Sequence, residues 1–222
     1  MKAIVFGATG MVGQGVLREC LLDPEITQVL VIGRGTTGQS HPKLKEIAHK
    51  NFEDFSPLEK EVTGYDACFF CLGVPSAGMA EADYRRMTRD FAVAAATTLS
   101  KVNPGMTFVF ISGAGTDSTE KGPIMWARVK GEAENALLKM PFKATYVFRP
   151  GIIQPLDGIV SRVKMYNLFY TVTRPIMPLL KWLFPKYVTT TRLLAQAMIK
   201  VARDGASKRI LESSDFNQLA GK

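Results

Sequence analysis

The sequence predicts an α/β fold, in which a doubly wound parallel sheet carries helices on both faces. The first indication is the short apolar run at residues 2–6, whose β-branched and aromatic residues are typical of a buried strand. Glycines follow at once, and apolar residues then recur at helical spacing over residues 11–22. A second strand pattern ends near residue 33, where a strand–helix–strand unit is expected to return.

Strand and helix patterns continue to alternate along the chain. We expect strands at residues 2–6, 27–32, 49–52, 65–72, 107–111 and 144–148, with a last short strand at 209–212. Helices are expected at residues 11–22, 53–63, 83–101 and 124–138. A further helix is capped by Thr190 or Thr191 and ends at Gly205, and the tail beyond the last strand is expected to fray.

The composition limits the class of protein. With 46% hydrophobic and 22% charged residues, the chain suits a single α/β domain over residues 1–222. The net charge of +8 comes from scattered Lys and Arg residues, which favours an anionic cofactor over a nucleic-acid partner. Cys20, Cys68 and Cys71 are expected to be buried reduced thiols rather than metal ligands. No leader pattern precedes the first strand, so the expected location is cytoplasmic.

The glycines after the first strand have the spacing of a phosphate-binding turn. In such a turn one glycine permits the sharp bend, one admits the ligand, and one lets the helix pack closely on the sheet. The N-terminus of the helix adds unpaired N–H groups and a partial positive charge, which together bind a pyrophosphate without a basic side chain. A purely structural turn is the alternative. The pattern favours a dinucleotide site formed by Gly7, Thr9, Gly10, Met11, Val12 and Gly13.

Arg34 stands at the end of the second predicted strand, directly after Gly33. In sites that prefer NAD(H), an acidic residue at this point accepts hydrogen bonds from the ribose 2′-hydroxyl. Here a guanidinium takes that place, and it can pair with a 2′-phosphate through two hydrogen bonds. The residue therefore favours NADP(H) over NAD(H), and the alternative is a surface arginine in a loop rich in Gly and Thr.

The string GATGMVG resembles the extended and atypical members of the short-chain dehydrogenase/reductase superfamily, whose usual form is GATGxxG. The run from residue 83 through WARVKGEAENALLK to FRPGIIQP is most similar to the atypical Tat-interacting-protein-like oxidoreductases. This resemblance covers roughly residues 1–155. It implies a Rossmann fold with about seven parallel strands and NADP(H) as cofactor. Some of these relatives are discussed as regulators, so the resemblance leaves catalysis open.

The resemblance also implies cofactor contacts outside the first turn. In this superfamily an acidic and a hydrophobic residue at the end of the third strand lie by the adenine, and Asn51 and Phe52 stand there in this chain. Leu72 and Gly73 end another strand pattern, where strand ends face the ligand crevice, and are expected to contact a cofactor ribose. The string FRPGII is similar to the segment that meets the nicotinamide amide, which implies contacts from Pro150, Gly151, Ile152 and Ile153.

The catalytic set of the superfamily is a Ser followed by Tyr-x-x-x-Lys, whose Lys also holds the nicotinamide ribose. Ser112 follows the fifth predicted strand and Lys130 completes the motif, but Trp126 occupies the Tyr position. An indole N–H donates hydrogen bonds and does not titrate in water, so Trp126 cannot be a general acid. The proton that accompanies a hydride must then come from Ser112 with water, from Lys130, or from a tyrosine elsewhere such as Tyr84 or Tyr166.

Residues 156–187 are apolar and aromatic, interrupted by Lys, Arg and three prolines. They lack the ~18 uncharged residues that a membrane span requires. Three interpretations remain open: a lid or substrate-binding insertion, a surface for another subunit, and a segment that lies on a membrane surface.

These patterns together predict an NADP(H)-dependent oxidoreductase or epimerase. It would act on an unidentified small carbonyl or hydroxyl substrate, as a monomer or a homodimer. The alternative is a non-catalytic NADP(H)-binding module that reports redox state to a regulatory protein partner. The missing Tyr favours the alternative, whereas the retained Ser112 and Lys130 oppose it.

Overall fold

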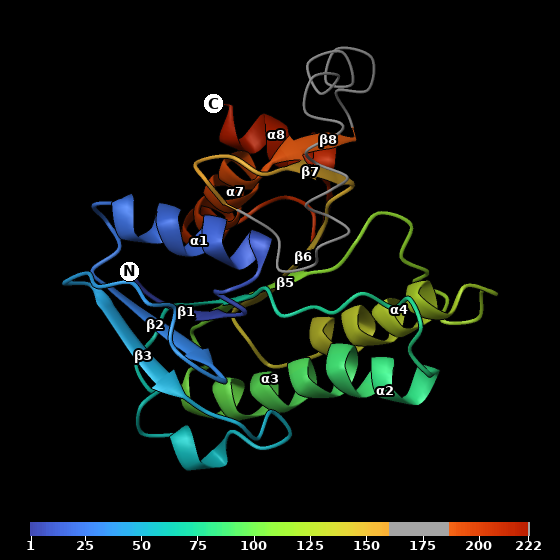
Figure 1. Ribbon diagram of the computed structural model, residues 1–222, viewed down its shortest axis with the longest axis horizontal. Coiled ribbons are helices and arrows are strands. Elements are labelled where there is room, and N and C mark those ends of the chain that lie inside the picture. The colour runs from blue at the N-terminus through green and yellow to red at the C-terminus, as the bar shows by residue number, and fades with distance from the viewer. Residues whose placement is uncertain (160–186, 222) are drawn as a thin grey trace.

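Seven parallel strands form the central sheet of the computed structural model, which describes residues 1–159 and 187–221 (Figure 1). Their order is β3-β2-β1-β4-β5-β6-β9, and every neighbouring pair is parallel. The strands are β1 (Lys2–Phe6), β2 (Gln28–Gly33), β3 (Leu44–Ala48), β4 (Ala67–Phe70), β5 (Thr107–Ile111), β6 (Ala144–Arg149) and β9 (Ile210–Glu212). The predicted doubly wound α/β fold is confirmed.

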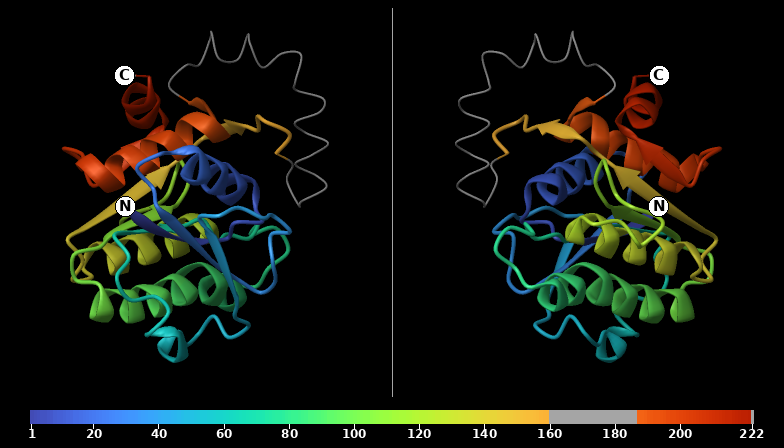
Figure 2. Two further views of the ribbon diagram at one scale, coloured as in Figure 1. Left: turned by 90° about the vertical axis from the view of Figure 1, so that its left-hand side faces the viewer. Right: turned by 90° about the vertical axis from the view of Figure 1, so that its right-hand side faces the viewer.

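Helices cover both faces of this sheet (Figures 1 and 2). One layer contains α1 (Met11–Leu22), α7 (Thr191–Asp204) and α8 (Ser213–Ala220). The other contains α2 (Glu81–Arg85), the π-helical turn η2 (Arg86–Asp90), α3 (Phe91–Val102) and α4 (Met125–Leu138). The 3₁₀ turn η1 (Ser56–Leu58) precedes β4, and a separate small sheet pairs β7 (Ile152–Gln154) with β8 (Val188–Thr190).

The strand sequences explain why both faces are covered. Along β1, Ala3 and Val5 pack into the core on the α1 and α7 side, whereas Ile4 and Phe6 pack into the core on the α3 and α4 side. Side chains alternate between the two faces of a strand, so a strand buried on both faces needs an uninterrupted apolar sequence. Phe70 of β4 continues the second core, with its ring centroid 5.2 Å from that of Phe6.

The turn after β1 lies where the strand order reverses, because β1 has β2 on one side and β4 on the other. In open parallel sheets, ligands bind beyond the strand ends at this point. Gly7 has φ +74°, and a Cβ there would lie 2.7 Å from the carbonyl carbon of Cys71. A Cβ on Gly13 would lie 2.0 Å from the carbonyl oxygen of Gly7. The first turn of α1 therefore packs directly on the strand-end turn.

The region between β3 and β4 differs from the sequence-based expectation. The third strand precedes residues 49–52, and residues 53–63 form only the short η1 turn instead of a helix. β3 is an edge strand paired with β2 alone, and its half-buried residues give a weak apolar signal. In the next segment, Asp54 Oδ1 accepts a hydrogen bond from the Ser56 N–H at 2.9 Å, a local bond that competes with helix formation.

Two further elements depart from the prediction. The helix expected at residues 83–101 begins earlier, at Glu81, and is interrupted by the wider turn η2. The tail does not fray, because a capping box formed by Glu212 and Asp215 starts α8. Phe216 of α8 then stacks on Phe148 of β6, with ring centroids 5.5 Å apart, and anchors the helix to the sheet.

The ends of α7 are those predicted from the sequence. Thr190 Oγ1 accepts a hydrogen bond from the Leu193 N–H at 3.1 Å, and Gly205 ends the helix with φ +79°. Of the predicted segment 156–187, residues 160–186 lie outside the described residues, and the role of the segment stays a prediction. None of the helices in the described ranges combines the length and the apolar character needed to cross a bilayer.

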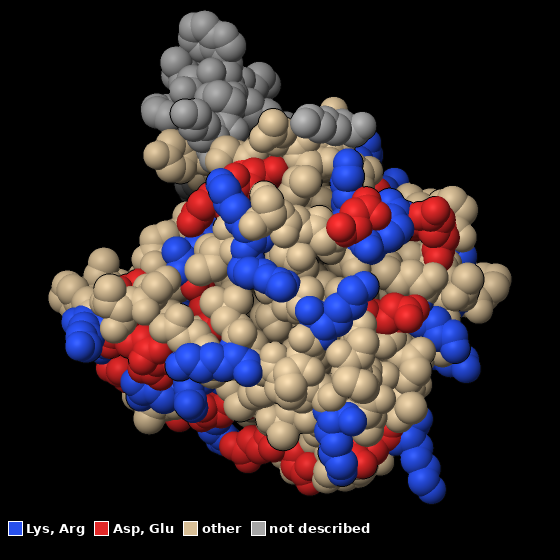
Figure 3. Space-filling view, turned by 180° about the vertical axis from the view of Figure 1, so that it is seen from behind, with Lys and Arg blue, Asp and Glu red and all other residues tan. Residues whose placement is uncertain are grey.

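Charged side chains of both signs are interspersed over the face seen in Figure 3. Charged side chains of the described chain also form pairs, such as Lys101 with Glu59 and Arg86 with Glu53. On this face, the described basic residues are therefore distributed rather than gathered into one patch, in line with their scattering along the sequence.

The contact between α1 and the glycine turn can be tested by Gly13→Ala. The new methyl group would overlap the Gly7 carbonyl oxygen, so we expect the free energy of unfolding to fall by about 1–3 kcal/mol. Gly105→Ala is the matched control, because a Cβ at Gly105 meets no atom of the described chain within 4 Å. Urea denaturation of both variants measures the difference, and equal stability would contradict the packing described above.

Candidate functional site

A small pocket of ≈ 110 Å³ opens at the carboxyl ends of β1 and β2. It brings together residues that are far apart in the sequence. Five of the predicted cofactor contacts are among its lining residues, which are Gly7, Ala8, Thr9, Val31, Gly33, Arg34, Gly35, Thr36, Phe52 and Leu72. The pocket therefore joins the glycine turn to the loop after β2.

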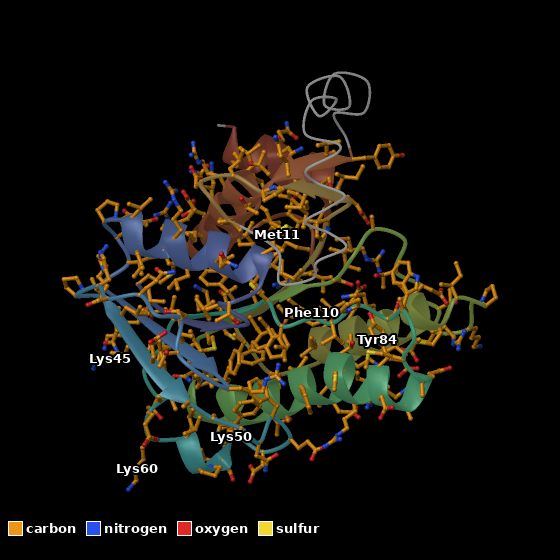
Figure 4. All side chains as sticks on the ribbon, viewed as in Figure 1. Met11, Lys45, Lys50, Lys60, Tyr84 and Phe110 are labelled. Atoms are coloured by element: carbon orange, nitrogen blue, oxygen red, sulfur yellow. The ribbon has the colours of Figure 1, made fainter. Side chains whose placement is uncertain are left out.

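The N-terminus of α1 is open toward an anion. Its N-cap is Gly10, which has no side chain to cap the first N–H groups, and the first turn carries no acidic residue. The turn is held by backbone bonds, with the Gly10 N–H donating to the Gly7 carbonyl oxygen at 2.9 Å. Gln14 Nε2 donates to the carbonyl oxygen of Thr9 at 3.1 Å. Figure 4 shows Met11 where α1 begins. Met11 and Val12 thus present backbone N–H groups at the positive end of the helix dipole.

Arg34 lies exposed on the loop after β2, and within the described ranges it forms no ion pair. Thr36 lines the same pocket and adds a hydroxyl group. Phe52 and Leu72 supply apolar walls, but Asn51 and Gly73 are not among the lining residues. The structure thus joins Phe52, without its neighbour Asn51, to the pocket.

Residues 150–153, which were predicted to meet the nicotinamide amide, use part of their backbone hydrogen-bonding groups for bonds within the protein. The Gly151 N–H donates to Ser213 Oγ at 3.0 Å, and the Ile152 N–H donates to the Tyr187 carbonyl oxygen at 3.0 Å. Pro150 has no N–H, and its carbonyl oxygen accepts from the Ala114 N–H at 2.9 Å. Any direct contact between this segment and a cofactor amide therefore relies on Ile153 and on the remaining carbonyl groups.

Ser112, Trp126 and Lys130 converge on the loop that follows β5. Ser112 is only 6% exposed, and its N–H donates to the Phe148 carbonyl oxygen at 2.8 Å, which extends the ladder between β5 and β6. A Cβ built on Gly113 would lie 4.0 Å from both Lys130 Cδ and Trp126 Cζ3. A Cβ on Gly115 would lie 3.6 Å from Trp126 Cη2. The indole edge therefore faces the loop backbone, and the lysine stem passes beside it.

The hydroxyl of Ser112 belongs to a short chain of hydrogen bonds. Ser112 Oγ and Thr116 Oγ1 are 3.0 Å apart, and Thr116 Oγ1 donates to the Gly113 carbonyl oxygen at 2.8 Å. A hydroxyl has one proton to donate, so the proton between the two oxygens belongs to Ser112. In this arrangement Ser112 presents lone pairs outward, and its proton is directed to Thr116.

Lys130 is the titratable group at the centre of this site. Its Nζ lies 5.8 Å from the centroid of the Phe110 ring on β5, which Figure 4 labels. Burial lowers the pKa of Lys130 to about 8, and the carboxylate of Glu134, one turn further along α4, partly opposes this shift. A lysine in this range is protonated in a large fraction of molecules near neutral pH and still releases its proton readily.

A buried ion pair behind the lysine was not predicted from the sequence. Glu134 is 0% exposed, and its Oε1 accepts a hydrogen bond from Arg149 Nε at 3.0 Å. Arg149 also donates to Ser118 Oγ at 2.5 Å, and the hydrogen bond to Glu134 is the largest cause that raises the pKa of Arg149. The sequence signal was a carboxylate four residues after Lys130 on the buried side of a helix. It could not be assigned a partner, because Arg149 lies on a different element.

The sequence comparisons agree with the resemblance inferred from the motifs. No protein-family model matches the chain. The chain is 28% identical to "Protein FMP52-1, mitochondrial" of Scheffersomyces stipitis over 182 aligned residues. The alignment covers 79% of each chain. It is 26% identical over 154 residues to "Protein HTATIP2" of Rattus norvegicus, covering 68% of this chain and 62% of that protein.

Solved structures show the same fold. A short-chain dehydrogenase family protein from Francisella tularensis matches with a TM-score of 0.66 and 15% identity, covering 92% of this chain and 91% of that one. WbmG of Bordetella bronchiseptica, solved in complex with NAD, matches with a TM-score of 0.68 and 12% identity, covering 100% and 76%. The chain is similar to the FMP52 and HTATIP2 proteins and has the fold of these solved short-chain dehydrogenase/reductase structures. The resemblance to the atypical members is thereby confirmed.

The relatives correct one expectation. The yeast FMP52 proteins carry the word mitochondrial in their names, in Scheffersomyces stipitis and in Candida albicans alike. The predicted cytoplasmic location is therefore wrong by this comparison. The physical reason is that an α/β core has the same composition and strand pattern in a cytoplasmic and in a mitochondrial protein, so these features do not determine location.

The buried pair behind Lys130 can be tested by Arg149→Met. This change leaves the Glu134 carboxylate buried without its partner, and we expect the free energy of unfolding to fall by about 3–5 kcal/mol. The control is Arg203→Met, which removes a pair with Glu25 whose side chains are 38% and 63% exposed. For that variant we expect a loss below ~1 kcal/mol. Similar losses in urea denaturation of the two variants would contradict a structural role for the buried pair.

Proposed function

We propose that the protein is an NADP(H)-dependent oxidoreductase that acts on a small carbonyl or hydroxyl substrate. The observation that supports this most directly is the pocket that joins the glycine turn to Arg34, together with the open N-terminus of α1 that follows this turn in the chain. Main-chain N–H groups and a helix dipole bind a pyrophosphate, and the guanidinium binds an additional phosphate on the adenine ribose. The bound cofactor would supply a hydride.

The preference for the phosphorylated cofactor rests on the end of β2. No acidic residue lines the pocket there, and Arg34 and Thr36 offer a cation and a hydroxyl instead. Some structural neighbours are described with NAD, among them WbmG and MoeE5, so the fold alone leaves the choice open. The side chains of this pocket therefore supply the argument for NADP(H).

The groups beside the post-β5 loop support a catalytic role. Lys130 would hold the nicotinamide ribose, as its counterpart in the superfamily does, and Ser112 would accept or orient a polar group of the substrate. Both lie at the carboxyl end of β5, the edge of the sheet at which open α/β folds bind ligands. A non-catalytic NADP(H)-binding module that acts on a regulatory protein is the second candidate, and Trp126 in place of Tyr is the observation that favours it.

The cofactor preference is tested by Arg34→Asp. We expect NADPH binding to weaken about tenfold or more, because a carboxylate repels the 2′-phosphate, and NADH binding to change less than about threefold. Lys60→Asp is the matched control, since it makes the same charge change on an exposed side chain outside the pocket (Figure 4). Calorimetric titration measures the affinities. Equal NADPH affinity before and after the Arg34 change would overturn the preference for NADP(H).

The variant Trp126→Tyr distinguishes the oxidoreductase from the non-catalytic NADP(H)-binding module. A phenol beside Lys130 restores a group that transfers protons, so we expect carbonyl reduction to rise at least ~10-fold. Trp126→Phe is the control, because it changes the ring without adding an acid. NADPH oxidation is followed with a panel of aldehydes and ketones. Binding of NADPH without turnover in every variant would favour the non-catalytic module.

A further inference from the structure

We propose that Lys130 is the proton donor of this site and replaces the missing tyrosine as the general acid. The proposal rests on the proposed function, because it concerns the proton that accompanies hydride transfer to a carbonyl. It adds a specific role to a side chain that the resemblance assigns only to the cofactor ribose. The argument comes from the positions of the groups around the post-β5 loop.

The other described groups of this loop are poor donors. Trp126 presents the carbon edge of its indole to Gly113 and Gly115, and an indole does not titrate in water. Ser112 directs its proton to Thr116, whose own proton is committed to a carbonyl oxygen. A proton taken from Ser112 would also leave an alkoxide with no acid behind it among these groups.

Lys130 has the right placement and mobility. Its stem passes beside Gly113, and its Nζ lies over the Phe110 ring, with no hydrogen bond or ion pair to any residue in the described ranges. The ammonium group therefore retains three N–H donors. One or two of them can hold a ribose hydroxyl while another points to the substrate oxygen next to Ser112.

The charges around Lys130 keep it protonated near neutral pH. Burial lowers its pKa to about 8, and Glu134 on the same helix opposes the shift. Most charged groups on the elements packed against α4 are paired within the described chain: Arg149 of β6 with Glu134, Arg85 of α2 with Glu132 and Glu81, Arg86 of η2 with Glu53, Arg89 of η2 with Asp90, and Lys101 of α3 with Glu59. Asp83 of α2 is exposed and belongs to none of these ion pairs, and α2 also contributes the titratable Tyr84. A carboxylate near Lys130 favours its protonated form, so Asp83 does not oppose the proposal.

The chemistry balances with groups that are named. A bound NADPH, as the co-reactant, would supply the hydride for the carbonyl carbon, and the C=O π electrons would move to the oxygen. An N–H bond of the Lys130 ammonium breaks, and its proton forms the new O–H bond of the alcohol. Lys130 is left as a neutral amine, which takes a proton from water before the next turnover.

The decisive variants are Lys130→Arg and Lys130→Met. Arg keeps a cation for the ribose but does not release a proton at these pH values, whereas Met removes both functions. With NADPH and para-nitrobenzaldehyde, we expect kcat of Lys130→Arg to fall at least ~100-fold while its NADPH affinity stays within about threefold. Lys130→Met should lose both. Lys139→Met, an exposed lysine at the end of the same helix, is the matched control.

The pH profile supplies a second signature. Reduction needs the protonated lysine, so kcat should be level below pH about 8 and fall tenfold per pH unit above it. Oxidation of the alcohol needs the neutral amine and should show the opposite slope. Competitive labelling of the free protein with acetic anhydride, read by peptide mass spectrometry, should show the reactivity of Lys130 rising around pH 8, below the range of an unperturbed lysine. This readout does not depend on turnover.

Several outcomes would overturn the proposal. Unchanged kcat in Lys130→Arg, or labelling of Lys130 that follows the pH dependence of an unperturbed lysine, would exclude it while leaving the proposed function intact. Loss of the alkaline limb in Tyr84→Phe or Tyr166→Phe would assign the proton to that tyrosine instead. Absence of NADPH binding would remove the proposed function as well, and binding without oxidation of NADPH would favour the non-catalytic module over both.

Discussion

The approach of α1 to the turn after β1 is the constraint on which the rest of the site depends. Gly13 packs against the Gly7 carbonyl so closely that no side chain fits between them. This contact fixes where the first turn of α1 points, and it sets the distance between the helix N-terminus and the sheet edge. The same helix packs on α7 in the outer layer. The candidate phosphate site made of backbone groups thus follows from packing, because rigid amides attract an anion without reorganising.

Two electrostatic environments, one open to solvent and one buried, lie at the same edge of the sheet. At the glycine turn, partial charges on backbone groups and an exposed guanidinium face solvent. Beside β5, Lys130 is desolvated, and the Glu134 and Arg149 pair lies behind it. Because Trp126 stands where the superfamily motif has Tyr, Lys130 is the titratable group of that motif beside the loop. In the proposed reaction this one ammonium both holds the cofactor and supplies a proton, so its burial matters for both roles.

Local rules predicted the fold well where the signal is local. The apolar strands buried on both faces, the glycine turn and the Thr190 cap each follow from a few neighbouring residues. The η1 region was mispredicted because the hydrogen bond that Asp54 Oδ1 accepts from the Ser56 N–H competes with the helix, and β3 was misplaced because an edge strand needs fewer apolar residues. The pairing of Glu134 with Arg149 could not be predicted, since it depends on how a helix and a strand meet. The pocket was predicted in part, as Phe52 lines it and Asn51 does not.

The anchoring of α8 has a consequence for how the chain is made. Gly151 is held by Ser213, which is 62 residues further along, and α8 is itself fixed by the stacking of Phe216 on Phe148. A ribosome therefore releases the glycine turn and most of the sheet long before the residues that fix this segment are synthesised. During translation the pocket between the glycine turn and Arg34 can form first, and the segment at Gly151 is fixed only when the last helix docks.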